Sequence, residues 1–399
     1  MTAVSGSNGR LHTVPDVGMP AAEHNGGSAR LDVVDARALP YRYDVHGLLS
    51  IGSEIALREL AYFRVPPRRG GMDIEVRRGR VGLRRPRRSV RVQRGAGRVS
   101  YHEHLGGLGA NFDIVLGTPI RVTVGPLLAR SPHVVYTNVV EALLRFVLAS
   151  RDMILLHGAT MTLHGTGVML SAETDTGKTT TVLRMLRDHG GVFLSDDMTI
   201  VDATGRALCY PKPLTISAHT LQAVETAELS LKQRLRLAVQ SRIHSRSGRS
   251  IGQRLGDMNI PIMAVNALTQ MVVPPPKYHV GELVPCTQGE TTDLRRLFVI
   301  ERGAARHEPI DRAEAVDLLL ANTNDAYGFP PFRYFAPAIT LGDEGYEQLC
   351  LRERNVLRSA LQKVRIERLA RDDFSWSDAI PALVAQSHDA LVDPLEGAV

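Results

Sequence analysis

The segment from Gly167 to Asp197 constrains the fold of this chain more than any other. Its apolar start, Val168–Leu170, predicts a buried strand, and the apolar spacing over Thr180–Asp188 predicts a helix that ends at Gly190. Val192–Leu194 then predicts a second buried strand. A strand, a loop, a helix and a further strand in this order predict an α/β fold.

The loop between the first strand and the helix reads Ala172-x4-Gly177-Lys178-Thr179, which is the P-loop spacing with alanine in place of the first glycine. Backbone N–H groups at a helix N-terminus bind phosphate oxygens. We expect Lys178 to contact the β- and γ-phosphates and the Thr179 hydroxyl to bind magnesium. The predicted nucleotide-binding residues are Ala172, Glu173, Thr174, Asp175, Thr176, Gly177, Lys178, Thr179 and Thr180.

Asp196 and Asp197 follow the second strand, at the edge where parallel α/β sheets bind ligands. One carboxylate can bind the metal while the other accepts the proton of an attacking hydroxyl. We assign Asp197 to the metal and Asp196 as the base, and the reverse order stays open. Ala172 adds a Cβ to a tight turn and Asp175 brings negative charge near phosphate, so weak nucleotide binding also stays open.

These segments, together with Leu156-His157-Gly158-Ala159 and Gly165–Leu170, resemble the HPr kinase/phosphorylase-like kinases. The fold of that family is similar to the nucleotide domain of phosphoenolpyruvate carboxykinase, and the resemblance covers about residues 151 to 215. It implies a P-loop kinase domain that uses ATP and Mg²⁺. It also implies that His157, Lys178 and Asp196 are catalytic and that Thr179 and Asp197 bind the metal.

The rest of the chain is expected to surround this domain. Residues 1–30, rich in Gly, Ser, Ala and Asn, predict a disordered leader. Short strands, among them Tyr41–Val45, Phe112–Leu116 and Ile120–Val124, predict a smaller β-rich N-terminal domain over residues 31–135. The P-loop domain is then placed at residues 136–321.

Three further elements are expected in and after that domain. Asn138–Ser150 predicts a helix that packs beneath the kinase sheet, and the apolar run Pro261–Val273 predicts a buried strand. The apolar spacing over Tyr346–Ala370 predicts helix, so residues 322–399 are expected to form a helical C-terminal cap.

The basic character of the chain is local. Arg64–Arg98 contains 13 arginines and two acids, Asp73 and Glu75, so its net charge is 13 − 2 = +11, whereas the whole chain carries +6. The arginines alternate with apolar residues, which indicates half-buried strands. A solvated strand face and an anionic partner both stay open. Nucleic acid is the weakest such partner, because few aromatic residues interleave with the arginines.

Composition bounds the class of protein. The chain has 399 residues of which 44% are hydrophobic, and we find neither an apolar run of membrane-spanning length nor the order of a secretory signal. We therefore expect a cytoplasmic protein. Its three cysteines lie far apart, which argues against disulfides and a zinc site. A homo-oligomer stays open.

The predicted function is an ATP-dependent kinase that phosphorylates a hydroxyl of a small metabolite or of a peptide or protein serine. The alternatives are a nucleotide-binding regulatory module with weak or lost transfer, and an NTPase. Lys277 and Arg302 are candidates for charge stabilisation near the phosphates. The cationic segment Lys232–Arg254 is interpreted either as a lid over the transferred phosphate or as an exposed loop.

Overall fold

A computed structural model describes residues 39–67, 70–81, 90–95, 97–105, 108–173, 176–215, 261–272, 274, 277–327, 331–373 and 375–392. Residues Leu39–Val399 form one compact unit. The expected leader, the cationic segment Lys232–Arg254 and residues 82–89 of the arginine-rich region lie outside the described residues. Among the described helices, none combines the length and the apolar character needed to cross a membrane.

The described N-terminal residues form an eight-stranded sheet in the order β3-β1-β2-β4-β8-β7-β6-β5. Its strands are β1 (Tyr41–Val45), β2 (Leu49–Ser53), β3 (Arg64–Val65), β4 (Ile74–Arg78), β5 (Val90–Gly95), β6 (Arg98–Glu103), β7 (Phe112–Val115) and β8 (Ile120–Val124). The strands expected at Tyr41–Val45, Phe112–Leu116 and Ile120–Val124 are therefore present.

The arginines of this sheet lie on its strands as their alternation predicts. On β4, Ile74 and Val76 are fully buried. Arg77 of the same strand lies with its Nε 3.1 Å from Glu75 Oε2. Arg98 reaches Asp113 of the adjacent strand at 2.8 Å. Arg98 is 60% exposed, and a pair at such exposure contributes little stability. Both pairs offset part of the local positive charge.

The described residues of the second sheet form ten strands, with β22 between β18 and β19 and the others in the order β17-β12-β10-β11-β18-β14-β13-β9. These are β9 (Met153–His157), β10 (Ala159–Leu163), β11 (Thr166–Ser171), β12 (Val192–Ser195), β13 (Met198–Asp202), β14 (Arg206–Leu208), β17 (Thr287–Gln288), β18 (Thr291–Arg302), β19 (Arg306–Pro309) and β22 (Arg365–Arg371). The sheet is mixed: β11 runs parallel to β18, and β10 runs antiparallel to β11. The chain is therefore of the α/β class that the sequence predicts.

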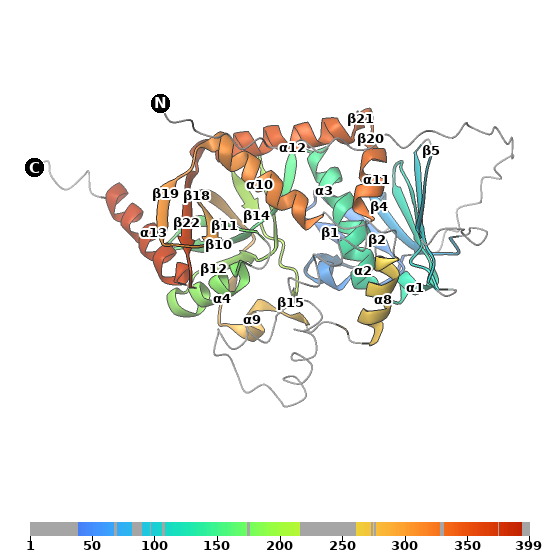
Figure 1. The fold of residues 1–399 in the computed structure, drawn as a ribbon, viewed down its shortest axis with the longest axis horizontal. Coiled ribbons are helices and arrows are strands. Elements are labelled where there is room, and N and C mark those ends of the chain that lie inside the picture. Colours follow the sequence, from blue (N-terminus) through green and yellow to red (C-terminus); the bar gives the residue numbers. More distant parts are fainter. Residues whose placement is uncertain are drawn as a thin grey trace, which may run out of the picture. The chain divides into compact units, whose positions relative to one another are not determined.

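Helices cover both faces of the ten-stranded sheet (Figure 1). Helices α10 (Arg312–Ala326) and α12 (Tyr346–Ala360) pack on the face of the sheet that carries Leu297 and Val299. Helices α4 (Lys178–His189) and α13 (Trp376–Val392) pack on the opposite face, which carries Phe298 and Ile300. The helices and short strands are η1 (Arg58–Phe63), α1 (Pro126–Ala129), α2 (Pro132–Val135), η2 (Tyr136–Val140), α3 (Glu141–Ala149), α4 (Lys178–His189), α8 (Ile262–Val272), α9 (Val280–Leu283), α10 (Arg312–Ala326), α11 (Phe332–Phe335), η3 (Ala336–Ala338), α12 (Tyr346–Ala360), η4 (Leu361–Lys363), α13 (Trp376–Val392), β15 (Leu214–Thr215), β16 (Lys277–Tyr278), β20 (Thr340–Leu341) and β21 (Glu344–Gly345).

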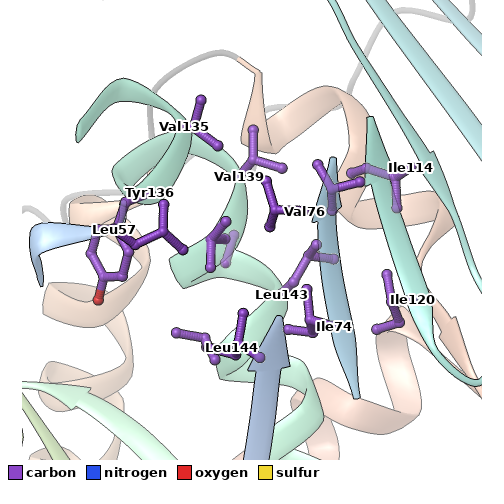
Figure 2. Packing of buried hydrophobic residues seen from close by; sticks show 14 of the residues in the cluster. Leu57, Ile74, Val76, Ile114, Ile120, Val135, Tyr136, Val139, Leu143 and Leu144 are labelled. Carbon is purple, nitrogen blue, oxygen red and sulfur yellow. The ribbon is translucent and has the colours of Figure 1, made fainter. Parts of the chain in front are cut away.

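Helix α3 and the π-helical turn η2 form the centre of the largest core cluster. All residues of α3 are buried. Figure 2 shows Val139 and Leu143 beside Val76 and Ile74 of β4. The same cluster contains Leu155 of β9, so α3 contacts both sheets. The helix expected over Asn138–Ser150 is present and packs against the second sheet as predicted.

The buried strand expected over Pro261–Val273 is wrong, because this segment forms helix α8. Met263, Ala264 and Ala267 are buried at helical spacing, while Val265 between them is 45% exposed. An apolar run without alternation does not distinguish a strand from a helix.

The helix expected over Tyr346–Ala370 is wrong in its last part. Helix α12 ends at Ala360, and Arg365–Arg371 forms β22, which lies parallel to β18. Neighbours on both sides and helices on both faces bury Ile366, Leu369 and Ala370. The C-terminal region therefore supplies an inner strand of the sheet in addition to helices.

A buried polar cluster joins three distant segments of the chain. The Glu59 carboxylate of η1 accepts hydrogen bonds from Lys277 of β16 and from His133 Nδ1 of α2, the latter at 2.5 Å. Burial alone would raise the pKa of Glu59, but His133 and Lys277 lower it to about 2. The ionised carboxylate therefore stabilises the contact between these segments.

We predict that Leu143→Ala lowers the free energy of unfolding by about 2–5 kcal/mol, because it leaves a cavity between α3 and β4. Urea denaturation at pH 7 measures the change. The control is Leu351→Ala on α12, whose side chain is 57% exposed. Equal effects of the two substitutions would contradict the proposed core.

We predict that acid unfolds the protein in part through Glu59. Its pKa is lowered from 4.5 to about 2, so its stabilisation is complete above pH 4.5 and is lost as the pH falls towards 2. The lowered pKa of Glu59 contributes at most roughly 3 kcal/mol to the free energy of unfolding. Glu59→Gln should lower stability at pH 7 and reduce the further loss between pH 5 and pH 3. Urea titrations at both pH values test this, with the exposed Glu347→Gln as the control.

Candidate functional site

The loop between β11 and α4 is shaped by one glycine and one buried methyl group. Gly177 has φ +120°, a conformation that residues with a Cβ rarely adopt. Ala172 is 1% exposed and belongs to the same core cluster as Val182 and Phe298. The alanine that replaces the first glycine of the expected loop is therefore a core residue.

Other residues predicted to bind the nucleotide lie in this loop and in the first turn of α4. Thr176 Oγ1 donates to the Glu173 carbonyl at 2.8 Å. Thr180 is buried in the first turn of α4. Thr174 and Asp175 lie outside the described residues.

Lys178 is the first residue of α4, and its side chain is buried in the site. Its Nζ atom has no hydrogen-bond partner within the described residues. Burial lowers the pKa of Lys178, while the charges of Asp197 and Asp196 oppose this change. An ammonium group without hydrogen-bond partners is costly to bury, so this position favours an anionic ligand.

Asp196 lies beside the first turn of α4. Thr179 Oγ1 donates to Asp196 Oδ2 at 2.7 Å. Asp196 is 8% exposed, and its Oδ1 is a buried atom with no hydrogen-bond partner within the described residues. Burial raises the pKa of Asp196 to about 6, against the opposing charge of Lys178. The hydroxyl and the carboxylate together present oxygen atoms of the kind that magnesium binds.

Asp197 lies between two basic side chains and is more accessible than Asp196. Lys212 Nζ is 2.6 Å from Asp197 Oδ2, and His157 Nε2 is 3.4 Å from Asp197 Oδ1. Partial removal from water would raise the pKa of Asp197, but Lys212 and His157 hold it well below its usual range. The side chain is 48% exposed. A ligand can therefore reach this carboxylate.

His157 ends β9 and is held by α10. Its backbone N–H donates to Thr323 Oγ1 at 3.1 Å, and its Nδ1 lies 3.2 Å from the Asn322 carbonyl. A carbonyl only accepts, so Nδ1 carries the hydrogen. Burial and the Lys178 charge lower the pKa of His157. The ring thus faces the Asn322 carbonyl with Nδ1 and Asp197 Oδ1 with Nε2, the latter at 3.4 Å.

Lys212 and Glu141 belong to this site, although no motif in the sequence indicates them. Lys212 Nζ also donates to Glu141 Oε1 at 2.6 Å. Burial would lower the pKa of Lys212, but Asp197 and Glu141 raise it. Lys212 follows a hairpin and Glu141 begins α3, so only tertiary structure brings them together.

Arg302 and Lys277, expected near the phosphates, occupy different places. Arg302 Nε donates to the Thr176 carbonyl at 2.9 Å, so it supports the loop from β18. Lys277 lies in the cluster with Glu59 and His133 described above. The structure therefore brings Arg302 to the loop and pairs Lys277 with the Glu59 carboxylate elsewhere.

A cleft of about 350 Å³ opens beside Lys212. Its walls come from η1, β12, α9 and β17 and are mostly apolar, with Tyr62, Lys212, His279 and Gln288 as polar groups. This volume lies at the lower end of the range for small-ligand sites. Lys212, which contacts Asp197, is the residue that connects this cleft to the site.

No known family model matches the chain, and no curated protein matches it significantly. Function is therefore inferred from the residues of the site itself.

Proposed function

We propose that this protein is an ATP-dependent, magnesium-requiring kinase that transfers the γ-phosphoryl group of ATP to a hydroxyl. One observation carries the proposal: Lys178 Nζ and Asp196 Oδ1 are both buried and without hydrogen-bond partners among the described residues. The first favours an anion and the second a cation. A magnesium–nucleotide complex supplies both at once.

The loop residues fit the nucleotide phosphates. The first four N–H groups of an α-helix have no partner within the helix, and the helix dipole favours negative charge there. Gly177 turns the chain into α4 without a side chain, so phosphate can approach the backbone. Lys178 then adds a full positive charge to these dipoles. We propose on these grounds that β11, the loop and α4 form the P-loop of an HPr kinase-like domain.

The residues beside Thr179 fit magnesium, which when bound neutralises phosphate charge and orients the transferred group. Thr179 and Asp196 offer one hydroxyl and one carboxylate. Among the described residues, no three His, Cys, Asp or Glu side chains are grouped to hold a metal ion. Magnesium at this place would therefore share its coordination with nucleotide phosphates, as is usual for this ion.

The geometry favours the reverse of the roles first assigned to the two aspartates. Asp196 contacts Thr179 and is buried, which suits the metal ligand. Asp197 is 48% exposed, so an acceptor hydroxyl can reach it. We propose that Asp197 accepts the hydroxyl proton, with His157 Nε2 lying 3.4 Å from its Oδ1.

The acceptor is proposed to enter through the cleft beside Lys212. A regulatory module or an NTPase would use the same loop. Neither needs an accessible carboxylate such as Asp197 beside Lys212, which lines the mostly apolar cleft. We therefore favour a small hydroxyl compound or a single seryl side chain over water as the acceptor.

We predict that Lys178→Ala lowers the rate of transfer by about 10²- to 10³-fold, because the charge acts on the phosphates. Mass spectrometry measures the gain of one phosphoryl group on a mixture of hydroxy amino acids, sugars, nucleosides and seryl peptides. The control is Arg187→Ala in the last turn of the same helix. Unchanged transfer in Lys178→Ala would overturn the P-loop assignment.

We predict different defects for the two aspartates. Asp196→Asn should weaken binding of magnesium with a non-hydrolysable ATP analogue, because it removes a metal ligand. Asp197→Asn should preserve that binding and slow transfer by about 10²- to 10⁴-fold, because it removes the base. Titration calorimetry and single-turnover kinetics measure the two effects. The opposite pattern would restore the order assigned from the sequence.

A further inference from the structure

We propose that Lys212 is a positioning residue, whose ammonium group fixes the orientation of the Asp197 carboxylate by joining it to Glu141 in the core. The inference rests on the proposed kinase function. It adds to that function a residue that touches neither nucleotide nor metal in the roles assigned above.

The two contacts of Lys212 are short, and the one with Glu141 is shielded from water. Its Nζ lies 2.6 Å from Glu141 Oε1 and 2.6 Å from Asp197 Oδ2. The Lys212 side chain is 10% exposed and that of Glu141 is 6% exposed. Buried charge-assisted hydrogen bonds are stronger and more directional than exposed ion pairs. The ammonium group is therefore a fixed bridge.

The backbone of Lys212 is stiff. Pro211 precedes it and Pro213 follows it, so φ is fixed on both sides, and a residue before proline is restricted to extended conformations. The Lys212 N–H also donates to the Tyr210 carbonyl at 2.8 Å. A stiff backbone loses less conformational entropy on folding, so the point from which the long side chain starts is fixed at lower cost.

The Glu141 end of the bridge is anchored in the main core. Tyr136 OH donates to Glu141 Oε1 at 3.0 Å and lies 2.7 Å from Tyr210 OH. Tyr136 belongs to the cluster that packs η2 and α3 against the eight-stranded sheet (Figure 2). The position of Lys212 is thus set by the N-terminal sheet and α3.

The Asp197 end is the one that needs this support. A carboxylate that is 48% exposed would otherwise change rotamer freely. Lys212 holds Oδ2, which leaves Oδ1 towards His157 Nε2 at 3.4 Å. Misplacement of a reacting group by about 1 Å can cost on the order of 10²-fold in rate. Fixing Asp197 in one orientation is therefore worth much of the rate attributed to the base.

The test compares Glu141→Gln with the double variant Lys212→Met/Glu141→Gln. The single variant keeps a side-chain oxygen for Lys212 and should lose no more than about fivefold in kcat. The double variant removes the bridge without leaving a buried carboxylate unpaired, so it should fold. Its kcat for the best acceptor of the mixture above should fall about 10- to 100-fold below the single variant, with the KM for ATP unchanged.

Crystal structures of the two variants give a readout that needs no acceptor. Asp197 should keep one orientation in Glu141→Gln and adopt several in the double variant. Equal kcat, or one unchanged Asp197 orientation in both variants, would overturn the role of Lys212. A wild-type protein that binds no magnesium–nucleotide would instead overturn the kinase function, so the two failures are distinguishable.

Discussion

The burial of helix α3 is the interaction on which the rest of the structure depends. Its apolar residues pack against both sheets. Its two charged residues, Glu141 and Arg145, are connected to the site through different side chains. Glu141 reaches Asp197 through Lys212. Arg145 forms two hydrogen bonds with Glu353, at 2.6 and 2.8 Å, and one with Asn324 of α10. The same helix α10 holds His157, so both basic neighbours of Asp197 depend on α3.

Those charges are costly to bury unless each has a partner. Arg145 pairs with the Glu353 carboxylate and Lys212 with the carboxylates of Glu141 and Asp197, so their burial fixes geometry. Lys178 Nζ and Asp196 Oδ1 lack such partners within the described part of the chain. The contrast separates the charges that are paired within the protein from those that we propose to pair with a ligand. It also explains why the two adjacent aspartates differ in character although their sequence context is nearly the same.

The sequence allowed prediction of the strand, loop and helix at Thr166–His189, because strand burial, glycine and helical spacing are all local signals. It did not distinguish α8 from a strand, since an apolar run shows no period. It also missed β22, where a strand follows an amphipathic helix after a short connection. Lys212 and Glu141 could not be found because they are 71 residues apart and meet only in the folded chain. The roles that we propose for the two aspartates rest on the contact of Asp196 with Thr179, which the sequence does not reveal.

The bond from Arg302 to the Thr176 carbonyl spans 126 residues of chain. The ribosome makes β11 and its loop long before it makes β18, their parallel neighbour. Contacts between such distant segments form slowly, because a long loop must close first. A nascent chain that ends before Arg302 contains the whole loop proposed to bind phosphate but not the strand that supports it. We therefore expect the supported form of this loop to arise late in synthesis, after most of the polypeptide has left the ribosome.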